Sequence, residues 1–352
     1  MCMFLKKIKF IFILIIFYQN PIYSKSTSFE NFDNKDFSKY FSGIVAFENK
    51  NNSKALDFFN SSKFLLNKHE PYFQTYLSTL ILENKVSQAI NVVKQKKNKT
   101  DFFDAYLLLI IDSLKKDNID KANNYLTESF NLENKNNFEL AILKNLKQYI
   151  FLFKEKKISE EKKEFGKLSL ISETFQRCYL GDVKTDEYFL NLINNKESNF
   201  TRYIHFYLGY LIENNRIEDA KKITKDIEYI DSTLLLSQTK SFIENNNETK
   251  ILSFFSCKNH NDLIGEFLFL ISNLYSSQDN FEKSNFYLNL SIFLNPKFLF
   301  NSSLLAENYF LNKEYDKTKK ILKNFTKEYN FYYWYRIKQE AQIIAKQKNK
   351  IE

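Results

Sequence analysis

One order of apolar and polar positions recurs along the chain: an apolar helix, a polar turn, an apolar residue, two arbitrary residues and a small residue. The fourteen positions from Tyr76 to Ala89 and from Tyr207 to Ala220 share it, with Tyr, Leu, Leu, Ile, Asn and Ala at matching places. Each copy predicts two amphipathic helices joined by a short turn. Neither helix can bury its apolar stripe alone, so neighbouring copies are expected to stack.

The small residues of this order serve as anchors that recur with a period of about 34 residues. They are Ala55, Ala89, Ala122, Ala220, Ser284 and Thr318. Successive anchors differ in residue number by 34, 33, 98, 64 and 34, and the two large gaps are close to three and two periods. Two weaker copies are therefore expected between Ala122 and Ala220, and one between Ala220 and Ser284.

The residues around each anchor have matching roles. A small anchor lets the second helix of a pair approach the first closely, and larger apolar residues four positions later lie on the same face. These larger residues are Phe59, Leu126, Leu288 and Leu322. The apolar residue three positions before the anchor is expected to begin the second helix. These residues are Val86, Ile119, Ile217, Phe281 and Tyr315.

Composition favours helices over sheets. The 352 residues include only 5 Gly and 3 Pro, which sheet-rich and wound α/β folds need at many tight turns. The turns use Asn, Asp and Lys instead, as in the run from Glu48 to Asn52. Asn can adopt the left-handed conformation that ends a helix, so it can partly replace Gly.

The repeat resembles the tetratricopeptide repeat (TPR), which carries Leu-Gly or Leu-Ala, then an aromatic, a small and a large apolar residue, and a closing Pro. The matching residues of the last two copies are Tyr275, Ser284, Leu288 and Pro296, then Leu305, Ala306, Tyr309, Thr318 and Leu322. The opening Trp is missing, and the closing Pro appears once in register. The chain as a whole is similar to signal-bearing TPR proteins of alphaproteobacteria. This resemblance implies an all-α, right-handed superhelical solenoid of antiparallel helix pairs that serves as a scaffold.

Five segments follow from these patterns. They are a signal peptide (1–24), a flexible lead-in (25–36), N-terminal TPR-like repeats (37–136), degenerate helical repeats (137–200) and C-terminal TPR-like repeats with a closing helix (201–347). The closing helix covers the end of the stack, with Trp334 expected to pack inward.

The N-terminus has the order of an export signal. Lys6, Lys7 and Lys9 precede the apolar run 10–18, and a short segment ending at Ser24 follows. Nine apolar residues are too few for a membrane span, which needs about 20. We expect cleavage after Ser24 and a periplasmic or otherwise exported protein without a stable membrane span; the alternative is an uncleaved N-terminal anchor.

The net charge and the cysteines do not indicate a specific ligand or reaction. The net charge is +9, but Lys is scattered among acidic residues and only four arginines occur, so a solvated surface is favoured over nucleic-acid binding. Cys178 and Cys257 could form a disulfide in an oxidising compartment or remain as two buried thiols, and the sequence leaves this open.

No local motif for catalysis is present in the sequence. His69, His205 and His260 lie far apart, and the five glycines are isolated from one another. Zinc sites and phosphate-binding loops need clustered His or Gly, so no metal, cofactor or catalytic residue is predicted and the protein is not expected to be an enzyme. An enzyme assembled from distant residues remains an alternative.

A stack of helix pairs creates a concave groove that can bind a protein or peptide. By their place in the repeat, the candidate groove residues are Tyr203, Tyr210, Asn273 and Glu307. The predicted function is therefore an exported scaffold for protein–protein interaction, in an envelope assembly or secretion complex. The alternatives are an envelope enzyme or cell-wall-glycan-binding module, and a self-assembling structural protein; the oligomeric state is left open.

Overall fold

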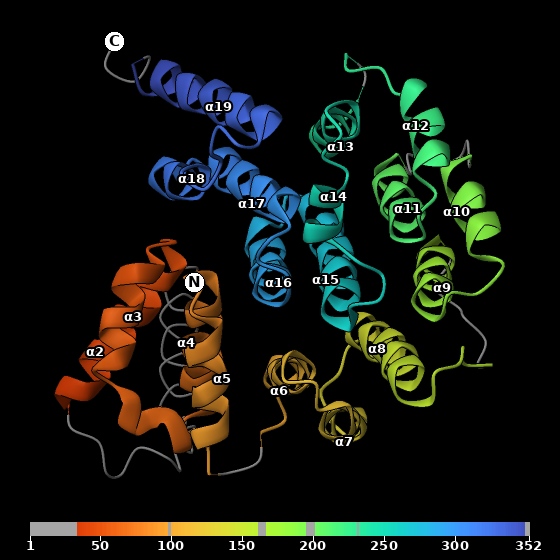
Figure 1. The fold of residues 1–352 in the computed structure, drawn as a ribbon. Helices are drawn as coiled ribbons and strands as arrows, with labels where there is room; N and C mark the ends of the chain where they lie inside the picture. Colours follow the sequence, from red (N-terminus) through yellow and green to blue (C-terminus); the bar gives the residue numbers. More distant parts are fainter. Residues whose placement is uncertain (1–33, 98–99, 161–166, 195–200, 231, 349–352) are drawn as a thin grey trace, which may run out of the picture.

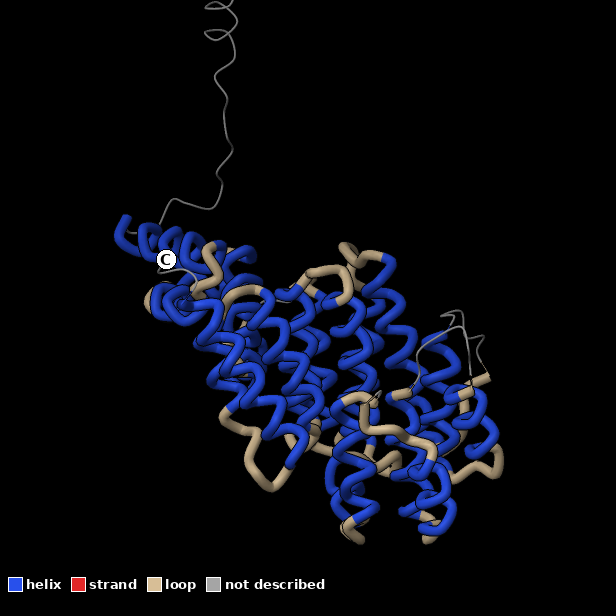
Figure 2. The backbone as a smooth tube through the Cα atoms, turned by 90° about the horizontal axis from the view of Figure 1, so that it is seen from above, coloured by secondary structure: helices blue, strands red, loops and turns tan. Residues whose placement is uncertain are grey.

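The computed structural model describes residues 34–97, 100–160, 167–194, 201–230 and 232–348, and all secondary structure in these ranges is helical (Figure 2). The all-α class is thereby confirmed for the described residues. The predicted signal peptide and most of the lead-in, up to residue 33, lie outside them.

Eighteen α-helices and one short 3₁₀ helix, Lys63–Asn67, occupy the described residues (Figure 1). The first nine are α2 (Asn34–Glu48), α3 (Asn52–Asn60), α4 (Glu70–Leu82), α5 (Val86–Gln95), α6 (Phe103–Lys115), α7 (Ile119–Phe130), α8 (Asn137–Glu155), α9 (Lys167–Leu180) and α10 (Thr185–Ile193). The next nine are α11 (Arg202–Glu213), α12 (Ile217–Lys225), α13 (Leu234–Glu244), α14 (Thr249–Phe254), α15 (His260–Ser276), α16 (Phe281–Leu294), α17 (Leu299–Leu311), α18 (Tyr315–Leu322) and α19 (Asn330–Lys348).

A left-handed residue follows the first helix of each pair and also follows the single helix α8. In the described chain these residues are Lys50, Asn84, Asp117, Lys156, Gly181, Asn215, Asn246, Asp279 and Lys313. Their successive residue numbers differ by 34, 33, 39, 25, 34, 31, 33 and 34. At Asn84 the next N–H, that of Lys85, donates to the Leu80 carbonyl at 2.8 Å and closes the helix end. Asn, Asp and Lys therefore fill a conformation that Gly usually supplies, as the turn composition suggested.

The anchors and helix starts agree with the sequence pattern. All six anchors are completely buried, and α5, α7, α12, α16 and α18 begin at the residues expected to begin them. In the intervals where weaker copies were expected, the structure contains α8, the pair α9–α10 and the pair α13–α14. Each anchor is small because the paired helices approach closely at that point.

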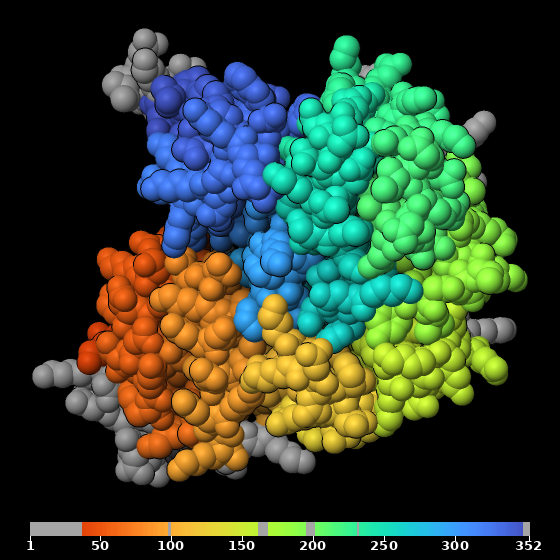
Figure 3. Space-filling model, viewed as in Figure 1, coloured from red at the N-terminus to blue at the C-terminus, as the bar shows by residue number. Residues whose placement is uncertain are grey.

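The chain closes on itself. Helix α16 contacts α4, α5 and α6, and α15 also contacts α6, so C-terminal helices lie against N-terminal ones (Figures 1 and 3). The Tyr309 hydroxyl donates to the Leu82 carbonyl at 3.2 Å, and Lys115 Nζ donates to the Leu294 carbonyl at 2.8 Å. Helices α15 and α16 therefore occupy the middle of the molecule, where an open stack would leave space.

The closing helix packs differently from its prediction. Helix α19 contacts α13 and α18 and buries Tyr332 and Ile343, but Trp334 is 68% exposed. The inward side of the helix runs through Tyr332, Gln339 and Ile343, and Trp334 lies on the other side. The expectation that Trp334 packs inward is therefore wrong, and an apolar face of α19 is left in solvent.

One glycine is required by the packing of the first helix pair. A Cβ atom at Gly43 on α2 would lie 2.5 Å from Cε1 of Phe59, which is completely buried. We expect Gly43→Ala to lower the free energy of unfolding by about 1–3 kcal/mol, because the buried ring has no room to move. Chemical denaturation of the purified chain measures this change.

Gly209 provides a matched control within helix α11. A Cβ atom there would meet Ile251 Cγ2 at 3.7 Å, which is ordinary contact. Gly209→Ala is therefore expected to be neutral or to stabilise by up to about 1 kcal/mol through helix propensity. Equal stability of Gly43→Ala and the unmodified chain would refute this account of the α2–α3 contact.

Candidate functional site

The four predicted groove residues lie in different environments. Tyr203 is a core residue that is 3% exposed, with its ring 5.9 Å from those of Phe175 and Phe206. The prediction that Tyr203 lines an open groove is therefore wrong for this structure. Tyr210 is half-buried, 6.0 Å from the ring of Phe189, while Asn273 on α15 and Glu307 on α17 are exposed.

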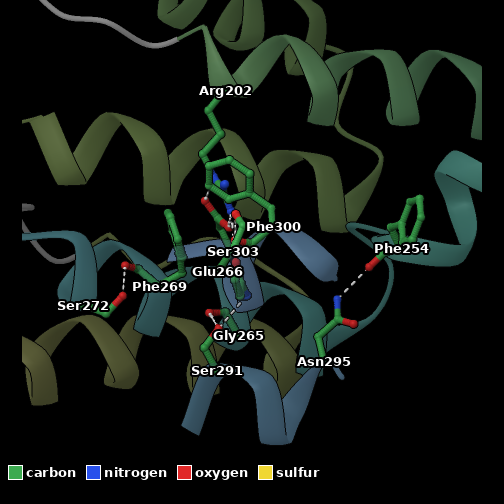
Figure 4. A network of polar contacts seen from close by, with 11 residues as sticks. Arg202, Phe254, Gly265, Glu266, Phe269, Ser272, Ser291, Asn295, Phe300 and Ser303 are labelled. Atoms are coloured by element: carbon green, nitrogen blue, oxygen red, sulfur yellow. Dashed lines mark hydrogen bonds and ion pairs between the residues drawn. The ribbon is translucent and has the colours of Figure 1, made fainter. Parts of the chain in front are cut away.

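The interior of the stack is instead occupied by residues from equivalent positions of three first helices. Arg202 on α11, Glu266 on α15 and Phe300 on α17 each precede the left-handed residue of their own pair by 13 positions. These three side chains thus come from the same position of the repeat, and the packing of α11, α15 and α17 brings them together. Figure 4 shows them converging.

Arg202 and Glu266 form a bidentate ion pair in this interior (Figure 4). Arg202 Nε donates to Glu266 Oε1 at 2.9 Å, and Nη2 donates to Oε2 at 2.6 Å. The two side chains are only 12% and 1% exposed. A two-bond pairing of guanidinium and carboxylate is the geometry that best satisfies both groups when water is excluded.

Aromatic rings enclose the guanidinium. Its central carbon lies 3.9 Å from the ring centroid of Phe269, 4.3 Å from Phe300, 5.1 Å from Phe298 and 5.3 Å from Phe206. Ring faces carry negative potential and so stabilise a cation that has lost its hydration. The rings come from α11, α15, α17 and the turn before α17, so the cluster joins helices that are distant in sequence.

Burial controls the titration of the groups around this pair. It raises the pKa of Glu266, and the Arg202 guanidinium opposes that rise. Burial and the nearby Arg202 charge lower the pKa of His205 to about 3, so this imidazole is neutral near pH 7. His205 Nδ1 lies 2.8 Å from Thr239 Oγ1. The Arg202–Glu266 pair and the contact of His205 with Thr239 join helices α11, α13 and α15, so this arrangement holds these helices together.

Polar side chains extend this network toward α16. Asn301 Nδ2 donates to Ser291 Oγ at 2.8 Å, and Ser291 Oγ donates to the Gly265 carbonyl at 2.6 Å. Asn295 Nδ2 donates to the Phe254 carbonyl at 2.7 Å (Figure 4). The network therefore links α15, α16, α17 and the end of α14. Sequence reasoning missed it, although the shared repeat position of Arg202 and Glu266 was a usable signal.

A pocket of about 460 Å³ lies between the α2–α3, α15–α16 and α17–α18 turns, where N-terminal and C-terminal helices meet. Lys50 Nζ donates to Asn312 Oδ1 at 2.8 Å, and Asn312 Nδ2 donates to Glu314 Oε1 at 2.5 Å. Lys317 pairs with Glu314 at 2.8 Å and with Glu83 at 3.4 Å. These polar groups bond to one another, so the pocket is bordered by polar contacts between N-terminal and C-terminal helices.

Cys178 and Cys257 form a disulfide with a Cα–Cα distance of 5.7 Å. Both residues are buried, and the bond ties the end of α9 to the turn between α14 and α15. This settles the choice between a disulfide and two thiols that the sequence left open, because only the fold brings residues 79 positions apart within bonding distance.

Metal-binding clusters and membrane-spanning helices are both absent from the described ranges. These ranges contain no group of three His, Cys, Asp or Glu side chains placed to hold a metal ion. None of the described helices combines the length and apolarity needed to cross a membrane.

Large apolar side chains are exposed on the first and last described helices. Phe41 and Val45 on α2 are 58% and 60% exposed, and they border an open groove of about 550 Å³ beside α3. Trp334 and Ile344 on α19 are 68% and 51% exposed. Contiguous exposed apolar faces often mark interaction sites, so these two faces are candidates for a binding surface.

Comparison with known proteins does not assign the chain to a family. No protein-family model matches the sequence, and a search of curated proteins found no significant match. The TPR resemblance therefore rests on the sequence pattern alone.

Proposed function

We propose that this protein is an exported, TPR-like superhelical scaffold that binds another protein and has no catalytic activity of its own. The observation that carries the proposal is the exposure of apolar side chains on α2 and α19, the first and last described helices of the stack. A monomer gains nothing from these groups in water, whereas an interface buries them. The interior groove positions are taken up by Arg202, Glu266 and their aromatic neighbours, which favours binding at the exposed helices.

Export is supported by the disulfide between Cys178 and Cys257. Stable disulfides form in oxidising compartments and are rare where glutathione and thioredoxin keep thiols reduced. This agrees with the basic and then apolar order of the segment that ends at Ser24. We infer an envelope location for the folded chain.

Crosslinking in the native envelope, followed by affinity capture of the full chain, tests the proposed function. We expect one specific protein partner whose recovery survives competition by unrelated envelope proteins. Repeated capture without any specific protein would refute the proposal. Retention on purified cell-wall glycan would favour the glycan-binding alternative, and large particles in light scattering of the purified chain would favour self-assembly.

A further inference from the structure

Helix α19 carries a regular apolar stripe on its exposed side. The stripe consists of Trp334, Ile337, Ala341 and Ile344, with spacings of three, four and three residues. Trp334, Ile337 and Ile344 are 68%, 38% and 51% exposed, and Ala341 is also exposed. The opposite side of the same helix packs on α13 and α18, so the helix is held rigidly while the stripe stays free.

The 3-4-3 spacing fits a partner helix better than any other ligand. Apolar residues at these intervals form a straight seam along a helix, and a second helix inserts its own side chains between them. A membrane surface requires only a broad apolar face and imposes no such interval. The small Ala341 between larger neighbours provides a hole into which a side chain of the partner can insert.

The charge around the stripe defines the partner further. On α19 itself, Glu340 is neutralised by its ion pair with Arg336. Lys327 Nζ lies 5.9 Å from the ring centroid of Tyr333, the residue that precedes Trp334. Lys338 is exposed directly beside the stripe. The surface that flanks the seam is therefore basic, and it is complementary to a helix with acidic flanks.

A second copy of the chain fits this surface poorly. Two α19 helices would bring two surfaces with the same excess of positive charge together, which opposes self-association.

We propose that the exposed face of α19 docks an acidic amphipathic helix of a partner protein. This inference rests on the proposed scaffold function and names the surface and the chemistry of the partner. The helix lies along the seam of Trp334, Ile337, Ala341 and Ile344, and its Asp and Glu side chains lie near Lys338 and the neighbouring basic residues.

Trp334 is the only tryptophan of the chain, so its fluorescence reports on this surface directly. The probe is a synthetic peptide held helical by a side-chain cross-link, with Leu at seam positions and Glu at flanking positions. Titration into the full chain is expected to shift the Trp334 emission to shorter wavelength and to protect it from acrylamide quenching. The same peptide with Lys in place of Glu is expected to bind at least about tenfold more weakly.

Variants that retain Trp334 complete the test. Ile337→Lys and Ile344→Lys are each expected to weaken peptide binding by about tenfold or more, because they place a charge in the seam. Val183→Lys, at a residue that is 94% exposed between α9 and α10, is the matched control and leaves binding unchanged. No emission shift with the acidic peptide, or equal binding by the Ile337→Lys variant, would overturn the inference.

Two further outcomes would assign the α19 surface to a different occupant, and each would overturn the proposed docking of an acidic helix. Sedimentation of the chain as a dimer that Ile344→Lys dissolves would assign the surface to a second copy. An emission shift with anionic phospholipid vesicles but none with the peptide would assign it to a membrane. If envelope crosslinking recovers a specific partner and Ile337→Lys leaves that recovery unchanged, the scaffold function stands and only this assignment of the surface fails.

Discussion

Replacing Arg202 with Met is expected to lower the free energy of unfolding by about 3–5 kcal/mol, because it leaves the carboxylate of Glu266 buried without its partner. Glu266 is 1% exposed at its side chain, so water cannot replace the two lost hydrogen bonds. Urea denaturation followed by far-ultraviolet circular dichroism measures the change. The matched control is Arg336→Met, which removes an ion pair to Glu340 that is about 30% exposed, and it is expected to cost less than about 1 kcal/mol.

The pH dependence of the Arg202→Met variant provides a second measurement. Burial already raises the pKa of Glu266, and removal of Arg202 raises it further. A carboxyl whose pKa is higher in the folded state than in the unfolded state binds its proton more tightly when folded. The variant therefore loses stability as the pH rises from the unfolded pKa, about 4.3, toward the folded pKa of Glu266.

The double variant Arg202→Met with Glu266→Leu separates charge from packing. Both groups are then apolar, no buried charge remains, and most of the lost stability is expected to return. If the single Arg202→Met variant were as stable as the Arg336→Met control, the ion pair would contribute nothing and the interior would depend on aromatic packing alone.

The second large effect concerns the disulfide. Reducing Cys178–Cys257, or replacing both residues with Ser, is expected to lower the free energy of unfolding by about 4 kcal/mol. The bond closes a loop of 79 positions, and its loss returns that conformational freedom to the unfolded chain. Thermal unfolding with and without dithiothreitol measures the loss, with the doubly substituted chain as the control that no longer responds to reductant.

Thiol titration checks the premise of that prediction. A chain that begins at Lys25 contains two cysteines, because Cys2 lies in the predicted signal peptide. When this chain is unfolded without reductant, it is expected to show no free thiol, and two after reduction. Two free thiols before reduction would contradict the disulfide and remove the structural support for export.

The sequence predicted the local structure well because each helix pair is determined by residues close together in the chain. The anchor Ala89 and the helix start at Val86 are three residues apart, and a pattern of apolar and small residues specifies both. The left-handed turn at Asn84 likewise depends only on its neighbours. The helical class and the starts of five second helices were therefore readable in advance.

The interior and the binding surface were not readable in the same way. Tyr203 and Arg202 are adjacent in sequence, and which of them points to the centre depends on a shift of one residue in repeat phase. The pairing of Arg202 with Glu266 joins α11 to α15, and the bond between Cys178 and Cys257 joins α9 to the turn before α15. Both therefore depend on how helices distant in sequence pack together. The buried side of α19 is determined by its contacts with α13 and α18, which the apolar character of Trp334 alone does not reveal.

The contact between the two ends also restricts how this protein can evolve. An open stack of helix pairs can gain or lose a unit with little consequence, since each unit touches only its neighbours. Here Lys50 bonds Asn312 and Tyr309 bonds the Leu82 carbonyl, so an inserted or deleted pair would pull these partners out of register. Closure is therefore expected to fix the number of units.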